Sequence, residues 1–233
     1  MALKWLNENI SRFNGDNKNI TLYGESAGAA SVHYLMCCPL AKGLFHKAIL
    51  MSGNCVCPWA YNPLENLNQR LAKACGYEGP LDDEKQIFEY LQKLPAEELV
   101  KPYLLSKDEN LDDCFFNFGP RIETYPNDTC IIKENPDKLL ENAWGDEIPV
   151  LMGGTSFEGL LMFPRAHYTP YILTELEEKP QHFLPLTVKQ QNSVEKQMEL
   201  GRKLKEAHFK DKKASMENVL NYCDVRMNSI SIN

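Results

Sequence analysis

The chain begins with hydrophobic residues at helical spacing and then changes to short runs of β-prone residues. The first set recurs at intervals of three, four and three positions, at Leu3, Leu6, Ile10 and Phe13. This spacing predicts an amphipathic helix over residues 2–13. Residues 19–23 form a short β-prone run, and residues 27–36 return to a helical pattern that Pro39 stops. The predicted order is therefore helix, strand, tight turn, helix.

Two further β-prone runs cover residues 45–51 and 148–152. Strands that alternate with helices favour right-handed crossovers, so we predict an α/β fold with a mostly parallel sheet and helices on both faces. The long stretch between these runs contains two helical patterns, 65–75 and 83–93, and one extended segment, 115–125. Because it is too long for a simple crossover, we expect it to pack over the edge of the sheet.

After Glu158 the sequence becomes polar and helical, and residues 190–209 are rich in Lys, Glu and Gln. A solvated helix explains this composition. The chain contains no internal repeat, no low-complexity tract and no clear linker. We therefore interpret residues 1–233 as one domain that is incompletely represented.

Charge and hydropathy exclude some partners. The formal net charge is −7 at pH 7, and the acidic residues are spread along the chain rather than gathered in a tail. This distribution offers no electrostatic footprint for DNA, RNA or an anionic membrane. No apolar run approaches the roughly 18 residues that span a bilayer, and the first residues lack the order of a signal peptide. We expect no nucleic-acid partner and no transmembrane segment.

The eight cysteines do not form a recognisable framework. They occur at positions 37, 38, 55, 57, 75, 114, 130 and 223. Because no CxxC pair and no accompanying histidine spacing is present, we expect neither a metal site nor another cofactor, and interpret most of the cysteines as small buried hydrophobes. Glycosylation sequons begin at Asn9, Asn19 and Asn127, and they matter only if the chain enters the secretory pathway.

The segment Gly24-Glu25-Ser26-Ala27-Gly28 fits the G-x-S-x-G nucleophile elbow, and it lies directly after a predicted strand and before a predicted helix. A sharp turn would hold Ser26 in strained backbone geometry with its hydroxyl above the sheet. Gly24 and Gly28 would leave room where strand and helix approach each other. The helix would aim its N-terminal N–H groups at the reacting carbonyl, with Ala27 as the oxyanion donor. These features predict nucleophilic catalysis by Ser26.

Four segments of the chain together resemble one enzyme family. They are residues 2–36, residues 42–53, the triplet Phe118-Gly119-Pro120, and the run from Ile148 to Gly159. The chain is similar to the type-B carboxylesterase and cholinesterase family, most of all to insect α-esterases, and the resemblance fades after about residue 175. It implies an α/β-hydrolase fold that is incomplete at both ends of this chain.

The same resemblance implies that Glu158 is the acid of a catalytic triad. This position follows the end of a predicted parallel strand, where the sites of open α/β sheets form. A carboxylate there would orient a histidine and stabilise its charged form. The alternative is that Glu158 is a surface acid that caps a helix.

A triad also needs a histidine, which in this fold follows the acid in chain order. His33 lies seven residues into the predicted helix, about 10 Å along its axis, which is too far to take the Ser26 proton. His46 opens a strand and so lies at the opposite end of the sheet. Neither is a convincing general base.

The remaining histidines are no better placed. His167 follows Glu158 too closely, and His182 and His208 lie in polar helical sequence without the glycine-rich turn of the family. The HGG-type oxyanion loop of the family also does not precede Ser26. We therefore expect this polypeptide as written to lack the catalytic histidine and to be inactive, and to fold poorly alone.

Two interpretations of function remain open. The first is a serine esterase that forms an acyl-enzyme with small uncharged carboxylic esters, and the resemblance implies roles in detoxification and capture of organophosphates. The second is a non-catalytic, cholinesterase-like binding or adhesion module. Cys75 matches a position that is disulfide-bonded in secreted relatives, but Tyr90 stands where its partner would be, which favours an intracellular location.

Overall fold

The fold is described from a computed structural model of the chain. It describes residues 1–106, 109, 116–124, 128–163, 167, 171–184, 188–189, 191–210 and 212–227. Cys114 and Asn127 lie outside these residues, as do the ends of the expected extended segment. Within that segment, residues 116–124 form bends and coil and no strand.

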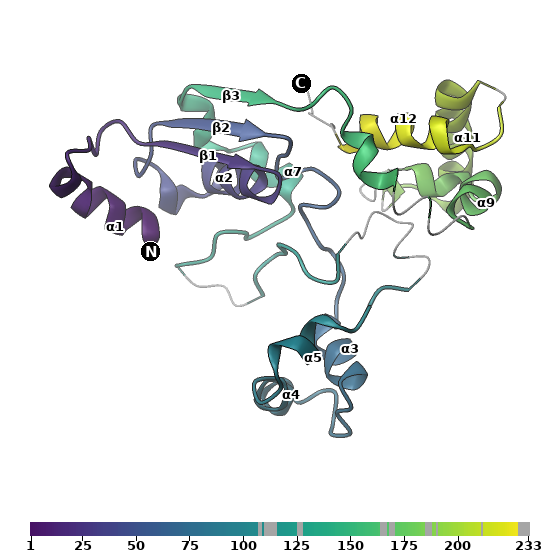
Figure 1. The fold of residues 1–233 in the computed structure, drawn as a ribbon, viewed down its shortest axis with the longest axis horizontal. Coiled ribbons are helices and arrows are strands. Elements are labelled where there is room, and N and C mark those ends of the chain that lie inside the picture. Colours follow the sequence, from purple (N-terminus) through teal and green to yellow (C-terminus); the bar gives the residue numbers. More distant parts are fainter. Residues whose placement is uncertain are drawn as a thin grey trace.

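The strands form a three-stranded parallel sheet (Figure 1). Its strands are β1 (Thr21–Glu25), β2 (Lys47–Met51) and β3 (Val150–Gly153), in that spatial order. The register places Tyr23 beside Ile49 and Ile49 beside Leu151. The predicted α/β class and parallel sheet are therefore confirmed, with each strand beginning two residues later than the β-prone run that predicted it.

Helix α2 (Ala27–Cys37) packs against β1 and β2 on one face of the sheet. Ala29 and Val32 of the helix form a buried core with Ala48 and Leu50 of β2. Helix α1 (Ala2–Asn9), continued by the 3₁₀ turn η1 (Ile10–Phe13), adds partly buried leucines to this core. The core is closed by Trp144, whose indole N–H lies 3.0 Å from the carbonyl oxygens of Leu35 and Cys38.

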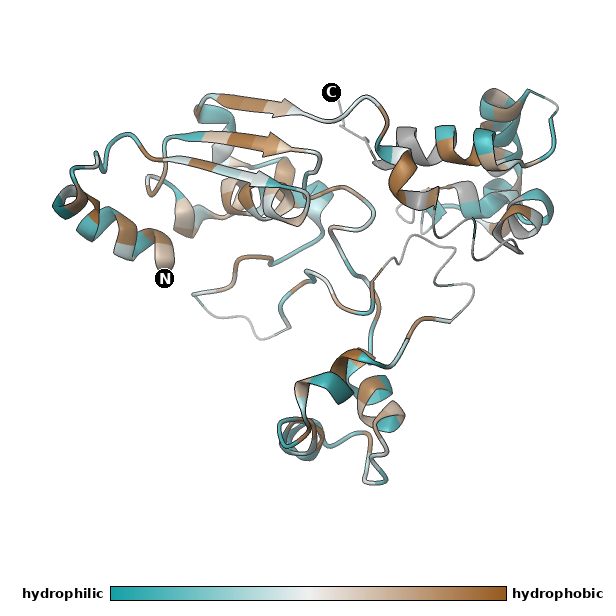
Figure 2. Cartoon of the chain, viewed as in Figure 1, coloured by the Kyte–Doolittle hydropathy of each residue, from teal (hydrophilic) through white to brown (hydrophobic). Residues whose placement is uncertain are grey.

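The opposite face of the sheet presents hydrophobic side chains to solvent. Tyr23 is 72% exposed and Leu151 is 66% exposed, although both lie in the middle of their strands. Figure 2 shows that β2 and β3 are coloured largely as hydrophobic, whereas β1 is paler. We expected helices on both faces, but among the described residues the helical cover of the sheet lies on the α2 side.

Two helical regions flank the sheet (Figure 1). The first contains α3 (Leu67–Ala74), α4 (Glu84–Leu91) and α5 (Ala96–Val100). Its first two helices confirm the patterns predicted for residues 65–75 and 83–93. Tyr90 donates a hydrogen bond to the carbonyl of Cys75 at 2.7 Å, and Cys75 is a free thiol.

Short elements lead to the second helical region. They are α7 (Pro136–Leu140), η3 (Trp144–Glu147) and, after β3, η4 (Glu158–Met162), whereas the 3₁₀ turn η2 (Pro39–Ala41) joins α2 to β2. The region itself contains α9 (Tyr171–Glu178), η5 (Pro180–Phe183), α11 (Val194–Phe209) and α12 (Met216–Met227). Helix α12 packs against η4, and α11 packs against η5. Within the described part of the chain, none of the helices is both long enough and apolar enough to cross a membrane.

Candidate active site

Ser26 lies at the junction of β1 and α2, on the elbow that the sequence predicts. Its backbone has φ 56° and ψ −120°, and a positive φ of this size costs free energy for a residue with a side chain. Two hydrogen bonds hold it there: its N–H donates to the carbonyl of Met51 at 2.8 Å, and its carbonyl accepts from the N–H of Ala30 at 3.1 Å. The fold thus maintains a strained turn at this serine.

Gly24 is required by the close approach of strand and helix. A Cβ atom at this position would lie 2.2 Å from the carbonyl carbon and 2.3 Å from the carbonyl oxygen of Gly28. Gly28 itself is different, because a Cβ atom there would meet nothing within 4 Å. Within this structure the elbow needs Gly24 for its missing side chain, whereas Gly28 provides the backbone on which Gly24 packs.

Ala27 is the first residue of α2. The N–H groups of the first helical turn have no intrahelical acceptor, and they carry the positive end of the helix dipole. A group that receives negative charge beside Ser26 would therefore be stabilised by this helix end. This position is the one that an oxyanion donor requires.

Glu158 follows β3 as the first residue of η4, and its side chain is held in a fixed position. The residue is 8% exposed, and its Oε1 atom accepts a hydrogen bond from the Thr155 N–H at 2.8 Å. Hydrogen bonds from the Ser52 side chain and from Thr155 lower the pKa of Glu158 below its usual value. The carboxylate is therefore ionised near neutral pH, which is the form that stabilises a charged histidine.

The end of β2 links the serine to the acid. Ser52 donates its backbone N–H to the carbonyl of Gly153 at 2.8 Å and its side chain contacts Glu158. The next residue, Gly53, approaches the elbow so closely that a Cβ atom there would lie 2.7 Å from the carbonyl oxygen of Ser26. Ser26, Ser52 and Glu158 thus lie at the carboxyl ends of three neighbouring parallel strands.

The sequence did not predict a role for Ser52. The sequence does contain a signal for such a role, because Ser52-Gly53 follows a β-prone run just as the elbow does. A second sign is structural: Ser52 has φ 54°, so the chain turns sharply at this residue as well.

The five histidines are all among the described residues. His33 accepts a hydrogen bond from the Cys55 N–H at 3.3 Å, and His46 accepts one from the Ile20 N–H at 3.2 Å. Because Ile20 precedes β1, His46 lies at the amino ends of the strands, as the sequence predicts. His167 stacks on Phe163 with ring centroids 5.6 Å apart.

The other two histidines lie in the helical region after β3. His182 is buried in η5, and His208 lies in the last turn of α11. A cavity of about 270 Å³ in this region is lined by charged side chains and Phe209. It is therefore unlike the apolar pocket that an ester substrate requires. The absence of a catalytic histidine from this chain stays a prediction.

One group of side chains in the described part of the chain has the spacing of metal ligands. The ligand atoms of His33, Cys37 and Cys55 all lie within 4.8 Å of one another. The sequence gave no sign of a metal site, because Cys55 is far from the other two residues along the chain. This group belongs to the far end of α2 and not to the elbow.

Comparison with known proteins identifies a family and several relatives. The profile described as the carboxylesterase family matches residues 1–230. Esterase B1 of Culex pipiens is 38% identical over 227 residues, which are 95% of this chain and 41% of that protein. Esterase E4 of Myzus persicae is 36% identical over 162 residues, which are 69% of this chain and 28% of that protein.

A solved structure agrees with these similarities. The crystal structure of juvenile hormone esterase from Manduca sexta, with OTFP covalently attached, matches with a TM-score of 0.79 and 27% identity. The match covers 97% of this chain and 42% of that chain. The present chain therefore spans less than half the length of each of these relatives.

Proposed function

Because the chain belongs to the carboxylesterase family, we propose that it carries the nucleophile and the triad acid of a serine carboxylic-ester hydrolase. The observation that carries this proposal is the strained backbone of Ser26 at a strand-to-helix turn. The family match and the esterase names of the relatives support the reaction class.

In the proposed reaction, the Ser26 hydroxyl attacks the carbonyl carbon of an ester. A histidine takes the hydroxyl proton and then gives it to the leaving alkoxide, which departs as an alcohol while an acyl-Ser26 ester remains. Water then attacks the acyl carbon, and the same histidine takes a proton from the water and gives it to the Ser26 oxygen. The bond between this oxygen and the acyl carbon breaks, and the free carboxylic acid is released. The Ala27 N–H stabilises the oxyanion, and ionised Glu158 stabilises the charged imidazole.

The substrates that we propose are small uncharged carboxylic esters. Organophosphates would react at the same serine, because its attack on phosphorus expels the leaving group of the organophosphate and leaves a phosphoryl group bonded to the serine oxygen. The covalent OTFP in the structure of the Manduca sexta relative supports covalent capture as chemistry open to this kind of site. A role in detoxification follows from such reactivity and is part of the proposal.

The test is a chimera with a full-length relative. Residues 1–233 replace the matching 41% of Esterase B1, and a second graft carries residues 19–53 alone, which include the elbow and Ser52-Gly53. Both chimeras are assayed with p-nitrophenyl acetate and labelled with a fluorophosphonate probe. We expect turnover and labelling, with a loss of about 10³-fold or more in kcat for Ser26→Ala.

Two controls make the result specific. Ser11→Ala removes an exposed hydroxyl from η1 and should leave activity unchanged. The chain expressed without the rest of Esterase B1 should show no enzymatic turnover. Folded chimeras that neither label nor hydrolyse the ester would contradict the proposal and favour the binding-module interpretation.

A further inference from the structure

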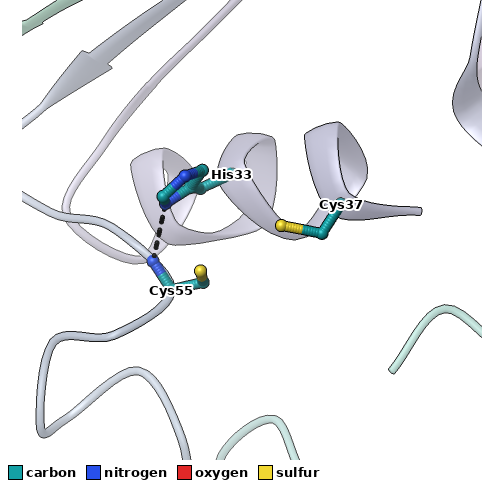
Figure 3. A group of neighbouring side chains, drawn as sticks. All are labelled: His33, Cys37 and Cys55. Carbon is teal, nitrogen blue, oxygen red and sulfur yellow. Dashed lines mark hydrogen bonds between the residues drawn. The ribbon is translucent and has the colours of Figure 1, made fainter. Parts of the chain in front are cut away.

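A group of three soft donor side chains lies beside the last turns of α2, away from the elbow (Figure 3). His33 and Cys37 are one helical turn apart on α2, so they project from the same side of the helix. Cys55 lies in the loop after β2 and faces them. We call these three residues the soft-donor cluster.

We propose that the soft-donor cluster binds one zinc ion, which joins the loop after β2 to α2. Two thiolates and one imidazole, with water as the fourth ligand, form a donor set that zinc uses in proteins. The ligand atoms already lie within 4.8 Å of one another. Tetrahedral zinc with bond lengths of about 2.0–2.3 Å brings such atoms to roughly 3.5–3.8 Å. Side-chain rotations that move the ligand atoms by about 1 Å are therefore sufficient to form the site.

The histidine is in the correct form for a ligand. Its Nδ1 atom accepts the Cys55 N–H, so Nδ1 carries the lone pair and faces the cysteine. Zinc would replace the 3.3 Å hydrogen bond from the Cys55 N–H with a bond to the same nitrogen.

The two thiols also interact with each other. The Cys55 thiol donates a hydrogen bond to the sulfur of Cys37, so the two sulfur atoms already lie side by side. Binding of zinc releases both thiol protons to solvent, and the divalent charge then neutralises the two thiolates. The negative charge of Asp146 acts on both His33 and Cys37, so it favours a cation at this place.

The surroundings restrict how the cluster can move. Cys37 and Cys55 are buried in an apolar group with Tyr34 and Ile132. The Tyr34 hydroxyl lies 3.3 Å from the carbonyl oxygen of Cys55 and 3.1 Å from that of Ala60, so it anchors the loop. His33 is only partly buried, so this side of the cluster lies closer to solvent than the two buried cysteines.

The proposed zinc ion would have a structural role and not a catalytic one. The loop that contains Cys55 begins at Ser52-Gly53, which contact Glu158 and the elbow. Zinc at the soft-donor cluster would fix this loop to α2. The proposal does not depend on ester hydrolysis, because it rests on donor atoms outside the proposed active site.

The first test is metal binding by the reduced chain, carried in the full-length Esterase B1 chimera because we expect the chain to fold poorly alone. The chain is freed of metal with a chelator, and then Co²⁺ or Zn²⁺ is added. We expect one ion per chain, a cobalt–thiolate charge-transfer band, and a higher Tm with zinc. Cys37→Ser and His33→Gln should each weaken binding at least tenfold and reduce the band. Cys38→Ser is the matched control, since Cys38 is also a buried free thiol at the end of the same helix.

A second measurement does not depend on variants that fold. X-ray absorption of the zinc-loaded chain should show two sulfur ligands and one imidazole nitrogen. A shell made only of nitrogen and oxygen, no binding by the reduced chain, or equal losses in Cys38→Ser and Cys37→Ser would overturn the proposal. None of these measurements uses esterase activity. The zinc proposal can therefore be overturned while the proposed hydrolase function is kept, and the hydrolase function can be overturned while the zinc site is kept.

Discussion

The two faces of the central sheet differ in burial although the same strands form both. Leu50 in β2 points toward α2 and is fully buried, with 0% of its surface exposed. Leu151 in the neighbouring strand β3 lies one register row away and points to the other side, where it is 66% exposed. The two residues are chemically identical. Their burial is therefore decided by what packs on each face and not by the strand sequence.

The face of the sheet that α2 covers, here called the covered face, also positions the candidate active site. Gly24 lies in the same register row as Leu50, and α2 packs directly on its backbone. This contact aims the start of α2 at the end of the sheet, where Ser26 lies. The opposite face, which exposes Tyr23 and Leu151, is here called the open face. None of the described contacts that place Ser26 comes from it. Changes on the covered face should therefore affect the fold and the site, whereas changes on the open face should affect neither strongly.

The largest effect is expected for Gly24→Ala on the covered face. The added Cβ would lie 2.2 Å from a backbone atom of Gly28, so strand and helix would have to separate. We expect a loss of roughly 3 kcal/mol or more in the free energy of unfolding. Urea denaturation followed by circular dichroism measures this free energy, and a fall in soluble yield would accompany the loss. The control is Gly28→Ala, whose Cβ meets open space; similar damage from both changes would contradict the backbone-contact explanation.

A matched pair of leucines tests the comparison directly. Leu50→Ala should lower the free energy of unfolding by about 2–5 kcal/mol, because it leaves a cavity in the core. Leu151→Ala removes the same atoms from an exposed side chain and should change stability by about 0.5 kcal/mol or less. Urea denaturation of both variants gives the two values. Equal losses would show that the open face is covered in solution.

A smaller effect is expected at the carboxyl end of the sheet, for Ser52→Ala. The Ser52 hydrogen bond lowers the pKa of Glu158, so it adds stability above the ordinary value of 4.5, and this stability is lost as pH falls through the lowered pKa. Ser52→Ala should therefore raise the pKa of Glu158 and cost about 1–3 kcal/mol near neutral pH. The difference should vanish in acid, below both pKa values.

Unfolding experiments across this pH range measure the effect of Ser52→Ala. Glu158→Gln supplies the control, because Ser52→Ala should lose its pH dependence in that background. A pH dependence that persists without the carboxylate would assign the effect to another group.

The smallest effect on stability is expected for Tyr23→Lys on the open face. Because Tyr23 is largely exposed, the free energy of unfolding should change by about 0.5 kcal/mol or less. The charge should also reduce self-association through the hydrophobic side chains of the open face, Tyr23, Ile49 and Leu151. Urea denaturation and light scattering test the two parts. A loss above about 2 kcal/mol would mean that this face is packed, and the comparison of the two faces would fail.

Local sequence patterns predicted the elements that local interactions decide. The helical spacing of Leu3, Leu6 and Ile10 identified the first helix, and the G-x-S-x-G segment between a β-prone run and a helical pattern placed Ser26 at a turn. The strand bounds were less accurate. The run 148–152 became Val150–Gly153 because a strand begins where its partner supplies hydrogen bonds, here from Ala48 to Pro149.

Only the tertiary structure decided which distant residues meet. The parallel register brings Ser52 to Glu158, although about a hundred residues separate them along the chain. The packing of α2 brings Cys55 to His33 and Cys37, and it leaves Leu151 on the open face. Periodicity reports which side of one element is apolar, because it depends on neighbours three or four positions apart. It carries no information on the partner across the sheet, which depends on how whole elements pack together.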